Sequence, residues 1–405
     1  MIRTLIRKEI AGHLLSLRFS LALALFSAVT LTSVLAMYRQ YEQRAEDYTL
    51  CQARAGEPRA SIPPVLTSVL AWGLEDVTGR TVDLTQAPAV LTFPLQSPLS
   101  LLDGFFPILD LTYVVRVIGA LVALGFAFDA VCGEGRGGTL ALSLAAGASR
   151  GGILLGKLVG GSVVIAVLFL LPVLVGLSLL RVGFAAPLDA ELVLRALLWA
   201  AASLLYLVCF YCLGLLVSAL VATPKVALMG CLVLWTTLTF IVPGTLTSLL
   251  RLETGLQSPT RFEQVNFYTV RLAAKPREAV AEGQLQQREA RAQAMLAFSH
   301  RALSALRLLP GPAYVEVGTT LAGTGIGQMP AYFGAVQRFL RGAQQGRQAG
   351  TSIPAFAFQR ASLGACLQEA AAGILSLLIW TSTACWALTR AWARYDVRVK
   401  EAGPQ

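Results

Sequence analysis

The sequence is short of charged residues, which excludes an ordinary soluble domain. Only 14% of its 405 residues are Asp, Glu, Lys or Arg, whereas a soluble globular domain carries about 25%. The apolar residues are concentrated in long runs, as in proteins that cross a lipid bilayer. The formal net charge is +10, but the basic residues form neither one face nor one block. We therefore expect no nucleic-acid binding.

The sequence also lacks the residue sets that catalysis or metal binding needs. Its two histidines, His13 and His300, are predicted on opposite sides of a membrane, so no Ser-His-Asp set can form. No cluster of His, Cys and carboxylates has metal-ligand spacing. A G-x-x-x-x-G-K pattern ends at Lys157, but Leu158 follows where a phosphate-binding loop needs Ser or Thr. The sequence predicts no catalytic, cofactor-binding or metal site on this chain.

The seven cysteines give no sign of a disulfide framework. Cys209 and Cys212 form a C-x-x-C spacing, but they lie in an apolar run without the second pair that a metal site needs. Cys51 lies in a polar segment, where it is either inert or cross-linked to a second copy. The others lie in or beside apolar runs, as small packing residues do: Cys132, Cys231, Cys366 and Cys385.

Six apolar segments are long enough to cross the bilayer as helices, since a span takes about 20 residues. They are 19–37, 111–131, 153–180, 192–221, 226–242 and 368–389. Basic residues of short loops gather on one side, which predicts that both chain ends, with the tail 390–405, are cytoplasmic. The polar segments 38–110 and 243–367 then lie outside. The predicted fold is an all-α polytopic membrane protein with two mainly helical extracytoplasmic segments.

An amphipathic helix is predicted before the first span, over residues 1–18. Arg3, Arg7 and Lys8 fill one side, and a plain basic tail is the alternative. Its apolar residues recur at helical spacing: Leu5, Ile6, Ile10, Leu14 and Leu17.

The second outer segment carries its own helix signals. A helix is predicted from about Pro276 to Leu309, because Pro310 then stops it. A glycine-rich loop from Gly311 to Gln328 follows, and a further helix is predicted from Pro330 to Gln345. The first outer segment, acidic on balance, is predicted to mix short helices with loop.

The loop 132–152 predicts a short helix on the cytoplasmic face. Thr139 is expected to cap it, Leu140 and Leu144 to share one side, and Gly147 to end it. Such a glycine-hinged helix can carry motion between a soluble motor and the membrane helices, and a simple re-entrant turn is the alternative. Arg150 is expected to hold the next helix at the lipid head groups.

Three residues at the start of the third span add to this interpretation. Lys157 is expected to extend to the cytoplasmic interface. Gly156 and Gly160 make a small face that suits close helix packing.

Together these motifs resemble the cytoplasmic loop of type 2 ABC transporter permeases. The shared order is an acid (Glu134), Gly-Thr-Leu at 138–140, a leucine-rich stretch, Ser149-Arg150, and Gly156-Lys157. Arg7-Lys8-Glu9 is similar to the elbow of that family. The stretch Leu321–Gly325 is similar to an element of a subgroup with two large extracytoplasmic insertions. The chain departs from the family in its low charge just before Gly138.

The resemblance implies partners rather than catalysis by this chain. Two copies of a cytoplasmic ABC ATPase would dock on the helix from Thr139 to Arg150 and on the elbow. Leu140 and Leu144 would face outward and fill an apolar groove on the ATPase. They would hold ATP and Mg²⁺, and this chain would hold no cofactor. A second copy or a related permease would complete a dimer in a bacterial cytoplasmic (inner) membrane.

The expected function is export of a lipid, peptide or other amphiphile. One alternative is a force-transmitting subunit that acts on an extracytoplasmic partner without transport. An ion-driven carrier is a third class, but it would need acids in mid-span, and none is evident.

Charged residues within the predicted spans either extend to the outer head groups or form a polar cluster. An ionised side chain in mid-bilayer costs about 2.5–3.5 kcal/mol on insertion scales. Arg116 and Glu369 have opposite charge at similar depth. We therefore predict that they pair in the outer leaflet. Glu191 and Arg195 lie near the outer start of the fourth span.

Overall fold

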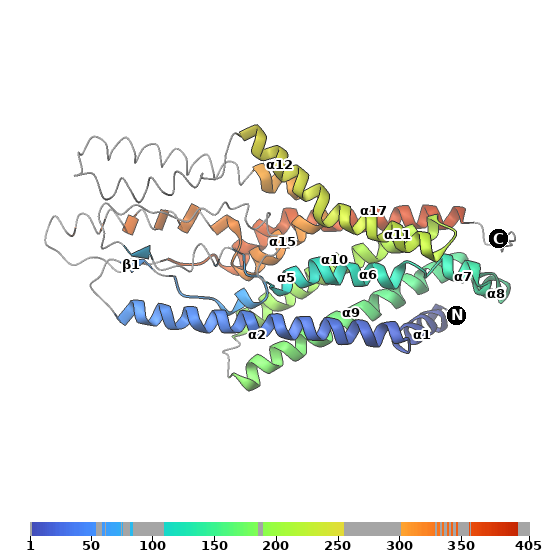
Figure 1. Ribbon diagram of the computed structural model, residues 1–405, viewed down its shortest axis with the longest axis horizontal. Coiled ribbons are helices and arrows are strands. Elements are labelled where there is room, and N and C mark those ends of the chain that lie inside the picture. The colour runs from blue at the N-terminus through green and yellow to red at the C-terminus, as the bar shows by residue number, and fades with distance from the viewer. Residues whose placement is uncertain are drawn as a thin grey trace.

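The computed structural model is a bundle of long helices, as predicted (Figure 1). It describes residues 2–53, 59–60, 62–73, 75, 82–83, 109–184, 189–254, 301–328, 330–332, 334–335, 338–339, 342, 346, 356 and 358–395. The described strands are two residues long: β1 (Arg59–Ala60) pairs antiparallel with β2 (Val82–Asp83). The predicted helix before Arg301 lies outside the described residues, as does the side chain of Cys51.

Six helical spans in the described residues are long and apolar enough to cross a membrane. The first is α2 (Leu17–Ala53), which continues well past the predicted apolar run. The second is built from α5 (Leu111–Val114), η2 (Val115–Gly119), α6 (Ala120–Ala127) and α7 (Cys132–Arg136). Next come α9 (Arg150–Gly183) and α10 (Ala190–Leu220). The fifth combines α11 (Pro224–Thr236), η3 (Thr237–Ile241) and α12 (Val242–Thr254), and the sixth is α17 (Leu363–Arg394).

Local sequence explains where these helices begin. The Ser149 hydroxyl accepts a hydrogen bond from the Gly152 N–H at 3.1 Å and so caps α9. Ser362 caps α17 in the same way. Pro224 occupies the first position of α11, where its missing N–H costs nothing.

Two of the spans contain a π-helical turn. The turns are η2 in the second span and η3 in the fifth, and the Trp235 Nε1–H donates to the carbonyl of Val117 in η2 at 3.1 Å. Such turns are rare, and they occur frequently at functional sites.

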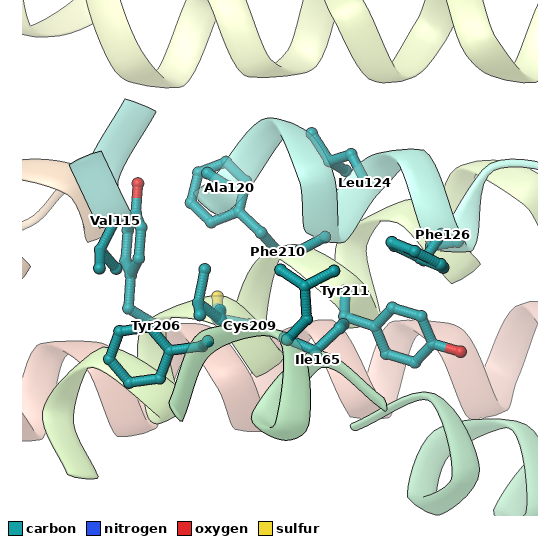
Figure 2. Packing of buried hydrophobic residues seen from close by; sticks show 14 of the residues in the cluster. Val115, Ala120, Leu124, Phe126, Ile165, Tyr206, Cys209, Phe210 and Tyr211 are labelled. Atoms are coloured by element: carbon teal, nitrogen blue, oxygen red, sulfur yellow. The ribbon is translucent and has the colours of Figure 1, made fainter. Parts of the chain in front are cut away.

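The core lies where α2, α6, α9 and α10 meet, and aromatic rings fill it (Figure 2). Tyr206, Phe210 and Tyr211 of α10 are all buried there. Gly214 lets α6 and α10 approach closely, since a Cβ at this position would lie 2.6 Å from the Ala127 Cβ. Close packing of this kind makes the bundle resist deformation.

Helix α15 (Pro310–Ala322) enters the bundle, which the sequence analysis did not predict. The Tyr314 ring stacks on Tyr206 at 4.6 Å, and the Trp380 Nε1–H donates to the Leu308 carbonyl at 2.7 Å. Tyr206 and Trp380 lie near the middle of α10 and α17. The chain at 307–310 therefore reaches the middle of the bundle, and α15 returns from there.

The prediction of a loop over Gly311–Gln328 is therefore wrong for most of its length. Pro310 and Pro312 sit in the first turn of α15, where helices need no N–H partner, so proline starts this helix. Gly323, at φ 75°, ends it. The further helix prediction is confirmed where it can be seen, because every described residue from 330 to 346 is helical.

The bundle has two distinct ends (Figure 1). We call one the elbow end; it holds α1 (Ile2–Leu14), α7, α8 (Thr139–Ala145) and the end of α17. We call the other the α15 end. There α12 diverges from the remaining helices (Figure 1).

Candidate functional site

At the elbow end, α1 packs across the beginning of α9. Gly156 and Gly160 make room for it: a Cβ at Gly156 would lie 3.2 Å from the Leu5 Cβ, and one at Gly160 would lie 2.8 Å from the Glu9 Cβ. The predicted small face is therefore used, and it receives α1. A larger side chain at Gly160 would push α1 away from α9.

Lys157 is buried beneath α1 and holds three elements together. Its side chain is only 1% exposed, and its Nζ lies 3.1 Å from Glu9 Oε1 of α1 and 2.8 Å from Glu134 Oε2 of α7. Lys8 Nζ lies 3.8 Å from the other oxygen of Glu134. We call Lys8, Glu9, Glu134 and Lys157 the Lys157 cluster. Its two cations balance its two acids.

The prediction that Lys157 extends to the membrane interface is therefore wrong. The long side chain finds two carboxylates within reach, and these offset the loss of its hydration. The Lys157 backbone contributes as well, since its carbonyl accepts a hydrogen bond from the buried Tyr211 hydroxyl at 3.1 Å. Lys157 thus links α1, α7 and α9 to α10.

A second ion pair lies beside this cluster. Arg18, at the start of α2, donates to the Asp129 carboxylate after α6 and lies over the Phe128 ring at 5.3 Å. Both charged side chains are partly exposed, so this pair contributes little to stability by itself. Nearby, His13 meets the Phe126 ring edge-on. Burial lowers the pKa of His13 despite the opposing effect of Glu9.

Helix α8 has a glycine in the left-handed conformation at each end. Its N-cap is Gly138, at φ 72°, and the Thr139 hydroxyl donates instead to the Glu134 carbonyl at 3.3 Å. The prediction of a Thr139 cap is therefore wrong, because the left-handed turn at Gly138 takes the cap position. Gly147, at φ 85°, ends the helix as predicted. The Ala148 N–H donates to the Ser143 carbonyl in the pattern of a Schellman motif.

The leucines of α8 do not face outward as predicted. Leu140 is fully buried in this chain and Leu144 is half-buried against the core. Neither position can therefore offer a complete side chain to a partner. The neighbouring Leu142 is 76% exposed. The exposed leucine of α8 is thus Leu142, which helical spacing did not identify because both faces carry leucine.

Arg150 connects the beginning of α9 to the end of α17. Its Nη1 donates to the Tyr395 carbonyl at 3.2 Å, and the Trp392 Nε1–H donates to the Arg150 carbonyl at 2.9 Å. The Tyr395 ring stacks on Trp392, and its hydroxyl lies against Gly135 of α7. Elements α1, α7, α8, α9 and α17 therefore form one connected unit, with Arg7 exposed on its surface.

The sequence matches the family described as ABC-2 family transporter protein over residues 3–309. The chain belongs to this family. A comparison with curated proteins finds no match. The matched region includes α1 and the whole Lys157 cluster, and it ends just before α15.

Membership makes the chain the membrane subunit of an ABC transporter, as its motifs predicted. ABC-2 permeases are generally not catalytic themselves, and they work with an ABC ATPase in a generally dimeric arrangement. No group of three or more His, Cys, Asp or Glu residues in the described part of this permease could hold a metal ion.

At the α15 end, the described ion pairs of this permease do not join Arg116 to Glu369 as predicted. Glu369 lies against Gly327, while the Arg116 guanidinium lies 5.7 Å from the Tyr113 ring. Charges just before and within α15 pair with each other. Arg307 Nε donates to both oxygens of the buried Glu316, at 2.7 Å each.

Arg195 does not extend to head groups either. It is buried, its Nη2 lies 2.8 Å from Glu191 Oε1, and its Nη1 donates to the Leu321 carbonyl at 2.8 Å. A cation at the last carbonyls of α15 also suits the negative end of the helix dipole. Arg195 therefore anchors the end of α15 to α10. Sequence reasoning could not find this role without knowing that α15 exists.

Glu75 forms two ion pairs at the same end of the permease. It is 1% exposed and lies 2.7 Å from Arg360 and 3.2 Å from Arg44. Arg360 also donates to the Gly323 carbonyl at 3.1 Å. The segments around 62–75, 321–328 and 360 are thus tied together beyond the ends of the spans.

Proposed function

We propose that this ABC-2 permease is the membrane half of an ATP-driven exporter of amphiphiles, with ATP hydrolysed by two copies of a separate ABC ATPase. The elbow end faces the cytoplasm of a bacterial cell, and both chain ends lie there. The distribution of basic residues supports this orientation, because Arg3, Arg7, Lys8, Arg136 and Arg150 gather at the elbow end. A second copy or a related permease completes the transporter.

The ATPase docks on α8. Leu142 is the anchor, because it is the exposed apolar side chain of a helix whose other leucines are buried or half-buried. A small contact of this kind can depend on one residue. The left-handed glycines at both ends allow α8 to tilt without breaking the longer helices beside it.

The Lys157 cluster transmits the movement, and this observation carries the proposal. A displacement of α7 and α8 moves Glu134, which is bound to Lys157 of α9 and through it to Glu9 of α1. The contacts of Arg150 with Tyr395 and Trp392 pass the same displacement to α17. The elbow, the loop and two spans therefore respond together.

Force transmission without transport is the second candidate, and the α15 end favours it. Arg195 and Arg360 bind the last carbonyls of α15, and Glu75 binds Arg360 and Arg44. Motion of α10 and α15 would therefore move the attached outer segments against a partner. ATP-dependent movement of a labelled amphiphile in vesicles that contain only the permease and its ATPase separates this candidate from export.

Leu142→Asp tests the docking site. A charge in an apolar contact should abolish co-purification of the ATPase encoded beside this gene, or reduce its stimulation by the permease at least about tenfold. Membrane insertion should be unchanged, because Leu142 is exposed outside the spans.

The matched control is Leu50→Asp. Leu50 is also exposed, but it lies near the C-terminal end of α2, far along the bundle from α8. If both variants bind and stimulate the ATPase as the unmodified permease does, α8 is not the docking surface.

A further inference from the structure

A polar site lies inside the bundle around the first turn of α15. The Tyr206 hydroxyl donates to the Arg116 carbonyl at 3.0 Å, so Arg116 is level with the middle of α10. Gly311 of α15 is its neighbour: a Cβ there would lie 4.0 Å from Arg116 Cδ and 3.9 Å from the Leu238 carbonyl oxygen. The turns η2 and η3 and the beginning of α15 therefore meet at one place.

Arg116 is close enough to Asp110 for its charge to act on that carboxyl, but it forms no ion pair with a described acid. Its Nε is buried without a hydrogen-bond partner, and no carboxylate in the described part of the chain forms an ion pair with it. Asp110 is the acid at the start of the same span, but its oxygens already accept from Trp72 and Tyr113 backbone N–H groups. A cation within a membrane span is costly, and such residues mark binding sites or transport pathways.

Thr239 supplies an independent observation. It lies in η3, one residue after Leu238, and is only 4% exposed. Its hydroxyl has no hydrogen-bond partner, although buried hydroxyls are usually bonded. Arg116 and Thr239 thus bring two unused donors into the two π-helical turns that meet α15.

The first turn of α15 adds to the positive potential of this place. The helix carries no acidic residue in its own first turn, so the partial positive charge of its N-terminus is not offset from within the helix. We call Arg116, Thr239 and Gly311 the Arg116 site. Two of its members, Arg116 and Thr239, carry a buried donor without a partner, and the acceptor oxygens of an anionic group match such donors.

We propose that the Arg116 site binds the anionic head group, a phosphate or carboxylate, of a membrane amphiphile. The guanidinium of Arg116 pairs with the anion, and the hydroxyl of Thr239 donates to it. The apolar tail lies along the outer face of the fifth span, where Met229, Val233 and Ile241 are exposed. This inference rests on the proposed export function and names the class of its substrate.

The binding test uses the whole purified permease in detergent, without ATPase or ATP. Native mass spectrometry would compare binding of phosphatidylglycerol, phosphatidylcholine and inorganic phosphate. We expect phosphatidylglycerol to bind at least about tenfold more tightly than phosphatidylcholine, as one charge-assisted contact supplies. Arg116→Gln should abolish that preference, whereas Arg116→Lys should keep part of it. Thr239→Val, which leaves the charge in place, should weaken the preference by a smaller factor.

Arg390→Gln is the matched control, because Arg390 also lies beside an aromatic ring, 4.9 Å from Trp386, but at the elbow end. The Arg390→Gln variant should prefer phosphatidylglycerol over phosphatidylcholine as strongly as the unmodified permease does. An unchanged preference in both Arg116→Gln and Thr239→Val overturns the site. Inorganic phosphate that displaces phosphatidylglycerol at equal concentration overturns the assignment to an amphiphile. Since no ATPase is present, failure here is separate from failure of Leu142→Asp to release the motor.

Discussion

The elbow end of this permease and the interior around Arg116 treat buried charge in opposite ways. At the elbow end, Lys157 is buried between Glu9 and Glu134, and Lys8 completes a balanced cluster. At the α15 end, Arg195 and Glu75 are equally well paired, whereas inside the bundle the Arg116 Nε is buried without a hydrogen-bond partner. A fully paired cluster holds helices in fixed positions, whereas a buried donor without a hydrogen-bond partner is available to a ligand.

This difference assigns a task to each region. The elbow end links α1, α7, α8, α9 and α17 through side-chain contacts. Helices connected in this way move together when a force acts on one of them. The α15 end ties the segments around Glu75 and Arg360 to α15, and the Arg116 site lies in the interior where α15 begins. Each task depends on identified side chains, so substitutions of these side chains test it.

The largest effect is expected from Lys157→Met. It leaves Glu9 and Glu134 facing each other without the buried cation, and breaking a buried ion pair costs about 3–5 kcal/mol. Thermal unfolding of the purified permease should show this loss. The exposed Lys225 provides the control, as Lys225→Met should leave the transition unchanged. Equal transitions for both variants would mean that Lys157 does not hold the elbow end together.

A smaller effect is expected from pH at the α15 end. Asp110 precedes the second span, and its burial raises the pKa of its carboxyl from 3.8 to about 6, against backbone hydrogen bonds from Trp72 and Tyr113 and the charge of Arg116. A raised pKa means that the folded protein favours the protonated acid. This contribution is complete below pH 3.8 and is lost as the pH rises through about 6.

The melting temperature of the unmodified permease minus that of Asp110→Asn should therefore fall between pH 4.5 and 7. His13 contributes equally to the melting temperatures of both proteins, so its contribution cancels in the difference. Its lowered pKa would otherwise change stability with pH in the opposite direction. Asp189→Asn, at the exposed N-cap of α10, is the control and should show no such trend. A difference that stays constant with pH would show that Asp110 does not titrate in this range.

Sequence reasoning predicted the membrane architecture because the long apolar runs follow directly from bilayer thickness. It also predicted the end of α8 at Gly147 and the packing of Gly156 and Gly160, since these depend on local geometry. It could not predict that α15 returns into the bundle. Pro310 and Gly311 are compatible with a loop as well as with a helix start, and only Tyr206 and Trp380 from distant spans decide between them.

The site was predicted in part for the same reason. The coupling residues lie close together in the chain, so Glu134 and Arg150 could be assigned to one loop. The burial of Lys157 depends on Glu9, which is far away in sequence. The exposure of Leu142 rather than Leu140 depends on how α8 rests on the core. Both outcomes follow from tertiary packing, which helical spacing does not specify.

The central claim is that docking at α8 reaches the spans through Lys157 and Glu134. A double-mutant cycle on ATPase stimulation tests it most directly, with Lys157→Met, Glu134→Gln and the double variant in lipid nanodiscs beside a bound ATPase. If the two residues act through one contact, the double variant should lose no more stimulation than Lys157→Met alone, a coupling of about 1–3 kcal/mol. Losses that simply multiply, with the ATPase still bound, would contradict the account.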